Sequence, residues 1–210
     1  GNTAGYLGSN GENFGKELNA QHGNTDKRVA ELDEFLSGFN IGDFDVSLKN
    51  ELSDAQSQLN DVKSKRSTVK SLNISAKNAI NAYTAMNTSF LNTVALISKM
   101  SSQTEMTGLI SAYVNFLKGK ERAGIERAVI ANTFAADDFG EGMFQKFASL
   151  IAEQNSYNDV FMSFATENQK SYYSSKMQDQ QVAEVDRMRK VAIDNVEFGS
   201  FGIDPQYWFK

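Results

Sequence analysis

The feature of this sequence that most constrains its fold is the near absence of proline. The only proline among the 210 residues is Pro205. Because proline removes a backbone donor and clashes with the preceding turn, a chain almost free of it can run as long uninterrupted helices. Apolar residues recur at the helical spacing, and no stretch alternates apolar and polar residues for long enough to predict a strand. The sequence therefore predicts an all-α protein of long antiparallel helices in up-and-down bundles.

The predicted helices are separated by short polar or glycine-containing segments. They cover 2–9, 12–40, an apolar seam at 48–62, 76–100, 104–136, a segment ending near 165, 167–177, and 182–196. Ser101, Ser102 and Gln103 are predicted to connect two of them. Polar side chains that can accept from the first free backbone donors predict N-caps at Ser75, Thr166 and Asp204.

A faint internal repeat suggests two related halves. Residues of the first half match residues of the second at one constant offset: Phe14, Gln21 and Asp26 with Phe147, Gln154 and Asp159. We therefore predict one helical domain over 1–210, with approximate halves 1–103 and 104–210.

Composition excludes several classes of protein. There is no cysteine and only one histidine, His22, so we predict no catalytic residue, no metal site and no cofactor. The net charge of −5 argues against broad affinity for nucleic acid, and any anion site must be local. No apolar run is long enough to predict a membrane span.

The segment 117–139 is the part of the chain around which we expect the rest to be organised. On a helical wheel Arg127 and Lys120 fall inside the apolar arc, with Gly124 between them. A cation beside small residues in a helical bundle is a candidate anion site. The alternative is a structural arginine that bridges helices, and for Lys120 a stem that packs while its head reaches water. Arg122 and Glu126 are predicted to pair on the opposite, wet face.

For other polar residues, the sequence leaves both a structural and a functional role open. Tyr6, in a helix flanked by glycines, either belongs to the core or lines the same pocket. Asp137, Asp138 and Glu141 lack the ligand spacing of a calcium loop, which favours a solvated turn.

Three separated motifs give the chain a resemblance to a known family. AGYLGSNG with FGKELNAQ near the start, ERAGIERAVIANTF in the middle and IDPQYWF at the end resemble the nitrate- and nitrite-sensing domain family. The resemblance implies an all-helical ligand-sensing domain that binds a small anion such as nitrate or nitrite through arginines. One of these corresponds to Arg127. Another belongs to a Glu-Arg pair ahead of the Gly5–Ser9 segment, and this chain begins at Gly1. His22 stands where many relatives carry arginine.

The resemblance, together with helices at both ends, leads us to expect the extracytoplasmic sensor domain of a transmembrane receptor, such as a chemotaxis receptor. It would be periplasmic, anchored in the inner membrane by flanking helices, dimeric through the whole receptor, and would not bind nucleic acid. The predicted ligand-binding residues are Arg127, Lys120, Gly124 and Tyr6. A receptor domain that binds another protein and no small ligand is the alternative, and an enzyme is the least favoured class.

Overall fold

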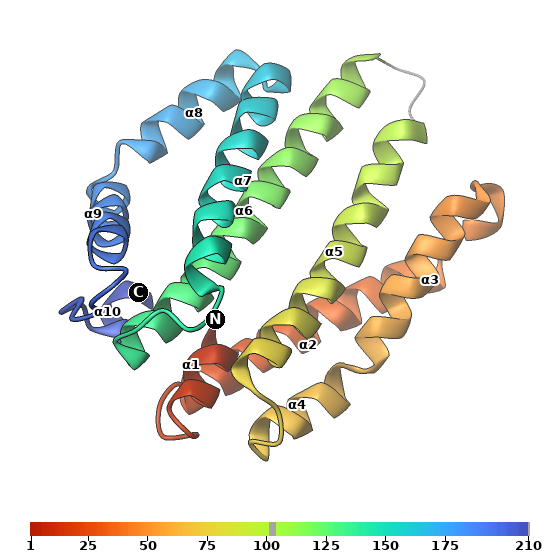
Figure 1. Ribbon diagram of the computed structural model, residues 1–210. Coiled ribbons are helices and arrows are strands. Elements are labelled where there is room, and N and C mark those ends of the chain that lie inside the picture. The colour runs from red at the N-terminus through yellow and green to blue at the C-terminus, as the bar shows by residue number, and fades with distance from the viewer. Residues whose placement is uncertain (101–103, 210) are drawn as a thin grey trace. The chain divides into compact units, whose positions relative to one another are not determined.

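The computed structural model describes residues 1–100 and 104–209, so the predicted connection at Ser101–Gln103 lies outside the described residues. The described chain consists of helices and their connecting turns and contains no strand (Figure 1). The prediction of an all-α fold of long helices is confirmed.

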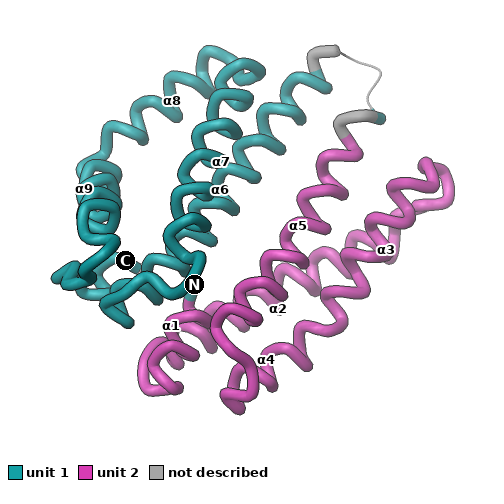
Figure 2. The backbone as a smooth tube through the Cα atoms, viewed as in Figure 1, with its two compact units in different colours: residues 1, 98–210 teal, residues 2–97 magenta. Residues whose placement is uncertain are grey.

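The chain divides into two compact units, which Figure 2 distinguishes by colour. Unit 2 comprises residues 2–97. Its elements are α1 (Asn2–Gly8), α2 (Gly15–Ser37), the short helix η1 (Ile41–Asp43), α3 (Val46–Asn60), α4 (Val62–Lys70) and most of α5 (Ala76–Met100).

Unit 1 comprises residue 1 together with residues 98–210. Its elements are the end of α5, α6 (Thr104–Ala136), α7 (Met143–Phe164), α8 (Glu167–Met177), α9 (Gln180–Asp194) and α10 (Pro205–Phe209). Within this unit α6 runs alongside α7, and α10 packs on α6 (Figure 1).

The helix starts follow the predicted caps. Thr166 and Gln169 form a reciprocal capping box at α8, Ser75 Oγ accepts from the backbone N–H of Asn78 at 3.2 Å, and Asp204 accepts from that of Gln206 at 2.8 Å. Each bond satisfies a backbone donor that the first helical turn leaves free. The seam at 48–62 departs from the prediction, because the helix is interrupted at Asp61 between α3 and α4.

Unit 2 has a core of small and aliphatic side chains. A cluster of Leu7, Leu18, Val69 and Ala79 joins α1, α2, α4 and α5, and Tyr6 packs against it. Burial of such a cluster stabilises the unit by removing apolar surface from water.

Unit 1 has a core rich in aromatic rings. Phe134 of α6 and Phe139, which follows that helix, contact Phe201 at centroid distances of 5.4 and 5.8 Å, and Phe139 stacks on Phe147 of α7 at 6.0 Å. Higher on the same helix pair, Gly119 allows a close approach, because a Cβ there would lie 3.3 Å from Asn158 Oδ1. The central helix is therefore held along α7 and, at its C-terminal end, by the segment that follows α9.

Candidate anion-binding site

Lys120, Gly124 and Arg127 lie on one face of α6. They follow one another at spacings of four and three residues, which keeps them in line on a helix and places Lys120 about 10 Å from Arg127 along the axis. Lys120 and Arg127 are exposed, and a Cβ at Gly124 would meet no atom within 4 Å. The structure thus brings these predicted residues together on an open stripe of unit 1. Arg127 does not point into a packed interior, as its place on the wheel had suggested.

Arg127 is bound to α10 through both its backbone and its side chain. The indole Nε1–H of Trp208 donates to the carbonyl oxygen of Arg127 at 2.9 Å. The guanidinium carbon of Arg127 lies 4.7 Å from the centroid of the Phe209 ring. Trp208 is buried and meets Phe134 edge-on, with ring centroids 5.8 Å apart. These contacts fix the helical turn that carries Arg127.

The guanidinium of Arg127 differs from the other guanidinium groups of the chain. Within the described residues, every other arginine pairs with a carboxylate: Arg28 with Glu31, Arg66 with Asp26, Arg122 with Glu153, Arg187 with Glu184, and Arg189 with Glu126. Arg127 has no carboxylate within ion-pair distance in that part of the chain. A guanidinium stacked by its face keeps its in-plane donors for another acceptor.

The backbone of Gly1 also lies at this place. A Cβ on Gly1 would overlap the Phe209 ring and would lie 3.8 Å from Nη2 of Arg127. The backbone at Gly1 therefore adjoins both the guanidinium of Arg127 and the ring on which it stacks.

Glu126, the residue before Arg127, is buried at the centre of unit 1. Its side chain is 2% exposed and accepts both Nε–H and Nη2–H of Arg189 on α9, each at 2.6 Å. Gln154 of α7 donates to the same carboxylate at 2.6 Å and accepts from Arg189 at 3.1 Å. Burial is the largest single influence on Arg189 and opposes its charged form, but the hydrogen bonds and the negative charges of Glu126 and Asp186 together outweigh burial and raise the pKa of Arg189 above its ordinary value.

The predicted surface pair between Arg122 and Glu126 is therefore wrong. Arg122 binds Glu153 of α7 and lies over the ring of Tyr157 at 5.7 Å. A partner on a neighbouring helix can satisfy a side chain that spacing within one helix assigns to a local pair. The position of Gln154 in the predicted repeat was the only sequence signal near this network.

Asp137 ends α6 and holds the loop before α10. Its carboxylate accepts from the backbone N–H of Phe201 at 3.0 Å, and its backbone has a positive φ of 53°. Gly199, with φ 63°, comes so close that a Cβ there would overlap the Asp137 carbonyl oxygen. Asp137 thus serves a structural purpose, and the described residues contain no cluster of acidic or histidine side chains able to hold a metal ion.

Tyr6 belongs to unit 2 and not to the unit that carries Arg127. Its ring covers Gly11, where a Cβ would lie 3.2 Å from the phenolic oxygen, and it borders the apolar cluster of that unit. Its predicted place in the ligand site stays a prediction. Sequence reasoning missed Trp208 and Phe209 as neighbours of Arg127, although both lie in the closing motif IDPQYWF.

The fold and the site together define an all-helical domain that carries an arginine and a lysine on an exposed stripe of its central helix. The chain belongs to the family described as nitrate and nitrite sensing, whose model matches residues 1–210. The resemblance inferred from the motifs is confirmed.

Two relatives place the family match in context. A nitrate regulatory protein of Klebsiella oxytoca is 26% identical over 144 residues, which is 69% of this chain and 36% of that protein. The solved structure of the NasR transcription antiterminator is similar with a TM-score of 0.90 at 23% identity, over 99% of this chain and 56% of that one. The latter likeness shows the fold, and the match covers 36% of the length of the first relative and 56% of the second.

The predicted assignment to a transmembrane chemoreceptor is wrong. The relatives that overturn it are a nitrate regulatory protein and a transcription antiterminator. As a separate finding, none of the described helices combines the length and apolar character that a membrane crossing requires. The periplasmic, inner-membrane location and the anchoring through flanking helices are corrected with it, as is a dimer formed through such a receptor. The helices at both ends had suggested the membrane, but a helix at a chain end carries no information about what adjoins it.

The predicted exclusion of nucleic acid from the partners is corrected as well, because one relative is a transcription antiterminator. The exclusion had rested on net charge. Net charge describes the field of this segment alone, whereas both relatives are longer than the segment they match.

Proposed function

We propose that this chain is the nitrate- or nitrite-sensing domain of a gene-regulatory protein and that Arg127 binds the anion. The family to which the chain belongs and the names of its relatives support a regulatory role. Nucleic acid is then a partner of the whole protein. In this proposal the chain performs no catalysis, and its residues 1–210 act as a single sensing domain.

The observation that carries the proposal is the free set of donors on Arg127. Its face lies over Phe209, while no described carboxylate occupies its edges. Nitrate is planar and weakly hydrated, and a guanidinium offers a planar fork of N–H donors that can match two of its oxygens. The structural-arginine alternative would require a protein acceptor at those edges.

Two further features support the same place. Lys120 and Gly124 extend the stripe of α6 with a second cation and with open space. The family resemblance also expects an arginine ahead of the Gly5–Ser9 segment. Gly1, upstream of that segment, lies beside Arg127, so the part of the chain near which the family carries that arginine adjoins the proposed anion site.

A nitrate titration by calorimetry tests the proposal. Arg127→Ala removes the charge and the donors, and the loss of a charged hydrogen bond is worth roughly 1.5–3 kcal/mol. We therefore expect nitrate to bind about tenfold more weakly or worse. Arg127→Lys should also bind more weakly, because an ammonium lacks the planar fork.

Arg122→Ala is the matched control, since it removes an arginine from the same helix that already has Glu153 as its partner. Its nitrate affinity should equal that of the wild type. Nitrite, chloride and sulfate complete the anion panel. Equal nitrate affinity in the wild type and in folded Arg127→Ala would assign Arg127 a structural role and end the proposal.

A further inference from the structure

The short helix α10 meets α6 at the turn that carries Arg127. Trp208 donates to the Arg127 carbonyl oxygen at 2.9 Å, and Phe209 lies under the guanidinium at 4.7 Å. Trp208 is 6% exposed and is packed against Phe134. Both ends of Arg127, its peptide group and its charged tip, are therefore in contact with consecutive residues of one helix.

Stacking on Phe209 and binding of an anion make different demands on the guanidinium. The ring attracts the cation through the guanidinium face, whereas the N–H donors lie in the guanidinium plane and point outward at its edges. The two interactions can therefore coexist. An arginine side chain loses much rotamer freedom when it is fixed, and a ring that already holds it lowers the entropy cost of binding a ligand.

We propose that α10 is part of the anion site, with Trp208 and Phe209 as positioning residues of Arg127. This inference rests on the proposed function of Arg127. Phe209 holds the guanidinium plane, and Trp208 fixes the backbone from which the side chain extends. Anion binding and the docking of α10 on α6 are then coupled, and by linkage each strengthens the other by the same factor. When the site is occupied by an anion, α10 packs more tightly on α6.

The first test compares Phe209→Leu with Phe209→Tyr in nitrate titrations. The leucine keeps apolar volume but has no ring face, so we expect about two- to fivefold weaker binding. The tyrosine keeps the ring face and should restore wild-type affinity. Phe198→Leu is the matched control, because it makes the same chemical change at a ring that is 82% exposed in the loop before α10.

The second test uses Trp208 as a reporter. It is the only tryptophan of the chain, so the ¹H–¹⁵N spectrum contains a single indole signal, from the N–H that binds the Arg127 carbonyl oxygen. Nitrate should shift this signal in the wild type and slow the exchange of its proton with solvent. Chloride at equal ionic strength should do neither, and nitrate should leave the signal of Arg127→Ala unchanged.

The outcomes separate the two proposals. If the wild type binds nitrate but Phe209→Leu binds it equally well and the indole signal does not move, the coupling is overturned while the role of Arg127 stands. If the wild type binds no nitrate, the proposed function fails and the coupling fails with it. Should Phe209→Leu not fold, the indole signal of the wild type decides the question by itself.

Discussion

The two units each contain an ion pair between helices, but the two carboxylates lie in opposite surroundings. In unit 1, Glu126 and Arg189 have side chains 2% and 22% exposed, and both hydrogen bonds between them measure 2.6 Å. In unit 2, Arg66 of α4 binds Asp26 of α2 at 2.6 Å; the arginine is 13% exposed, but the aspartate is 59% exposed. The distances are the same, whereas access of water to the carboxylate differs.

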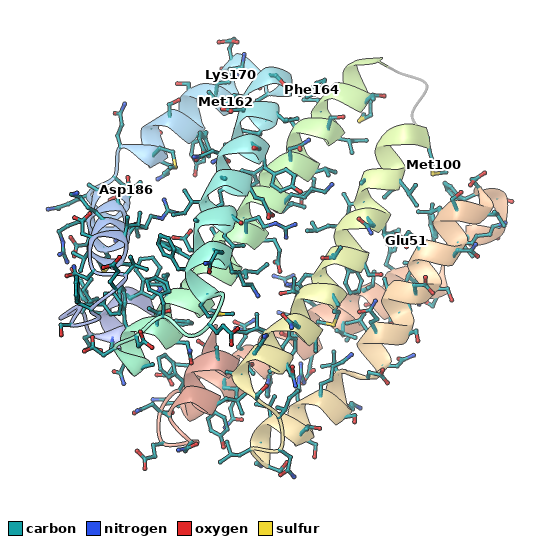
Figure 3. All side chains as sticks on the ribbon, viewed as in Figure 1. Glu51, Met100, Met162, Phe164, Lys170 and Asp186 are labelled. Carbon is teal, nitrogen blue, oxygen red and sulfur yellow. The ribbon has the colours of Figure 1, made fainter. Side chains whose placement is uncertain are left out.

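This difference shows that the contribution of an ion pair to stability depends on the surroundings of the charge that remains when one partner is removed. Removal of one partner from a buried pair leaves an uncompensated charge away from water, and the free energy of unfolding falls steeply. Where the charge that remains is exposed, water replaces the lost partner, and the pair contributes little to the free energy of unfolding. Figure 3 labels Asp186 on α9, the helix from which Arg189 reaches Glu126 of α6.

The largest effect should come from Glu126→Gln. The amide keeps the shape of the side chain but removes the buried counter-charge of Arg189, which keeps only Asp186 at 3.2 Å, a carboxylate that is 63% exposed. We expect the free energy of unfolding to fall by about 3–5 kcal/mol, measured by urea denaturation followed by circular dichroism.

The control for Glu126→Gln is the double change Glu126→Leu with Arg189→Met, which removes both charges and fills the space with apolar atoms. It should recover most of the loss, because paired removal leaves no buried charge. A double variant as unstable as Glu126→Gln would show that packing, and not the unpaired charge, determines the loss.

A much smaller effect should come from Arg66→Gln in unit 2, which leaves Asp26 as the unpaired charge. The carboxylate is more than half exposed, so we expect the free energy of unfolding to change by about 0.2–1 kcal/mol. The same urea experiment measures this change. The free energy of unfolding of the variant should also depend less on salt concentration, because salt screens exposed ion pairs. A loss as large as that of Glu126→Gln would remove the distinction between the units.

The smallest effect should be the pH dependence that His22 gives to unit 2. Burial and the charge of Arg66, opposed by Asp26, lower the pKa of His22 below its ordinary 6.5. The unfolded chain then takes up a proton more readily than the folded one, so stability falls as pH drops through 6.5 towards the folded pKa. His22→Gln should flatten this slope in urea midpoints measured on either side of 6.5. An unchanged slope would assign it to other groups.

The course of the helices could be predicted from the sequence because their signals are local. The predicted helix at 104–136 has the same bounds as α6, and Thr166 caps α8 through its own neighbour Gln169. Periodicity and capping depend on residues a few positions apart. No distant partner is needed to read them.

The surroundings of Glu126 and Arg127 could not be predicted, because their partners are distant in sequence. α6 is buried on several sides between residues 125 and 134, so it has no single apolar face for a helical wheel to find. Arg189 and Trp208 reach it from 63 and 81 residues away. Spacing within one helix cannot reveal such partners, which is why Glu126 was assigned to a wet face.

Gly199 shows that a binding site can restrict which residues are accepted at a position outside the site. Its positive φ and its closeness to the Asp137 carbonyl leave no space for a side chain. It touches no candidate ligand-binding residue, yet it sets the path by which the last segment returns to α6. If this glycine were replaced during evolution, the last segment would have to take another path. The ring of Phe209 would then no longer lie beneath Arg127. Gly199 should therefore be replaced during evolution as rarely as Arg127 itself.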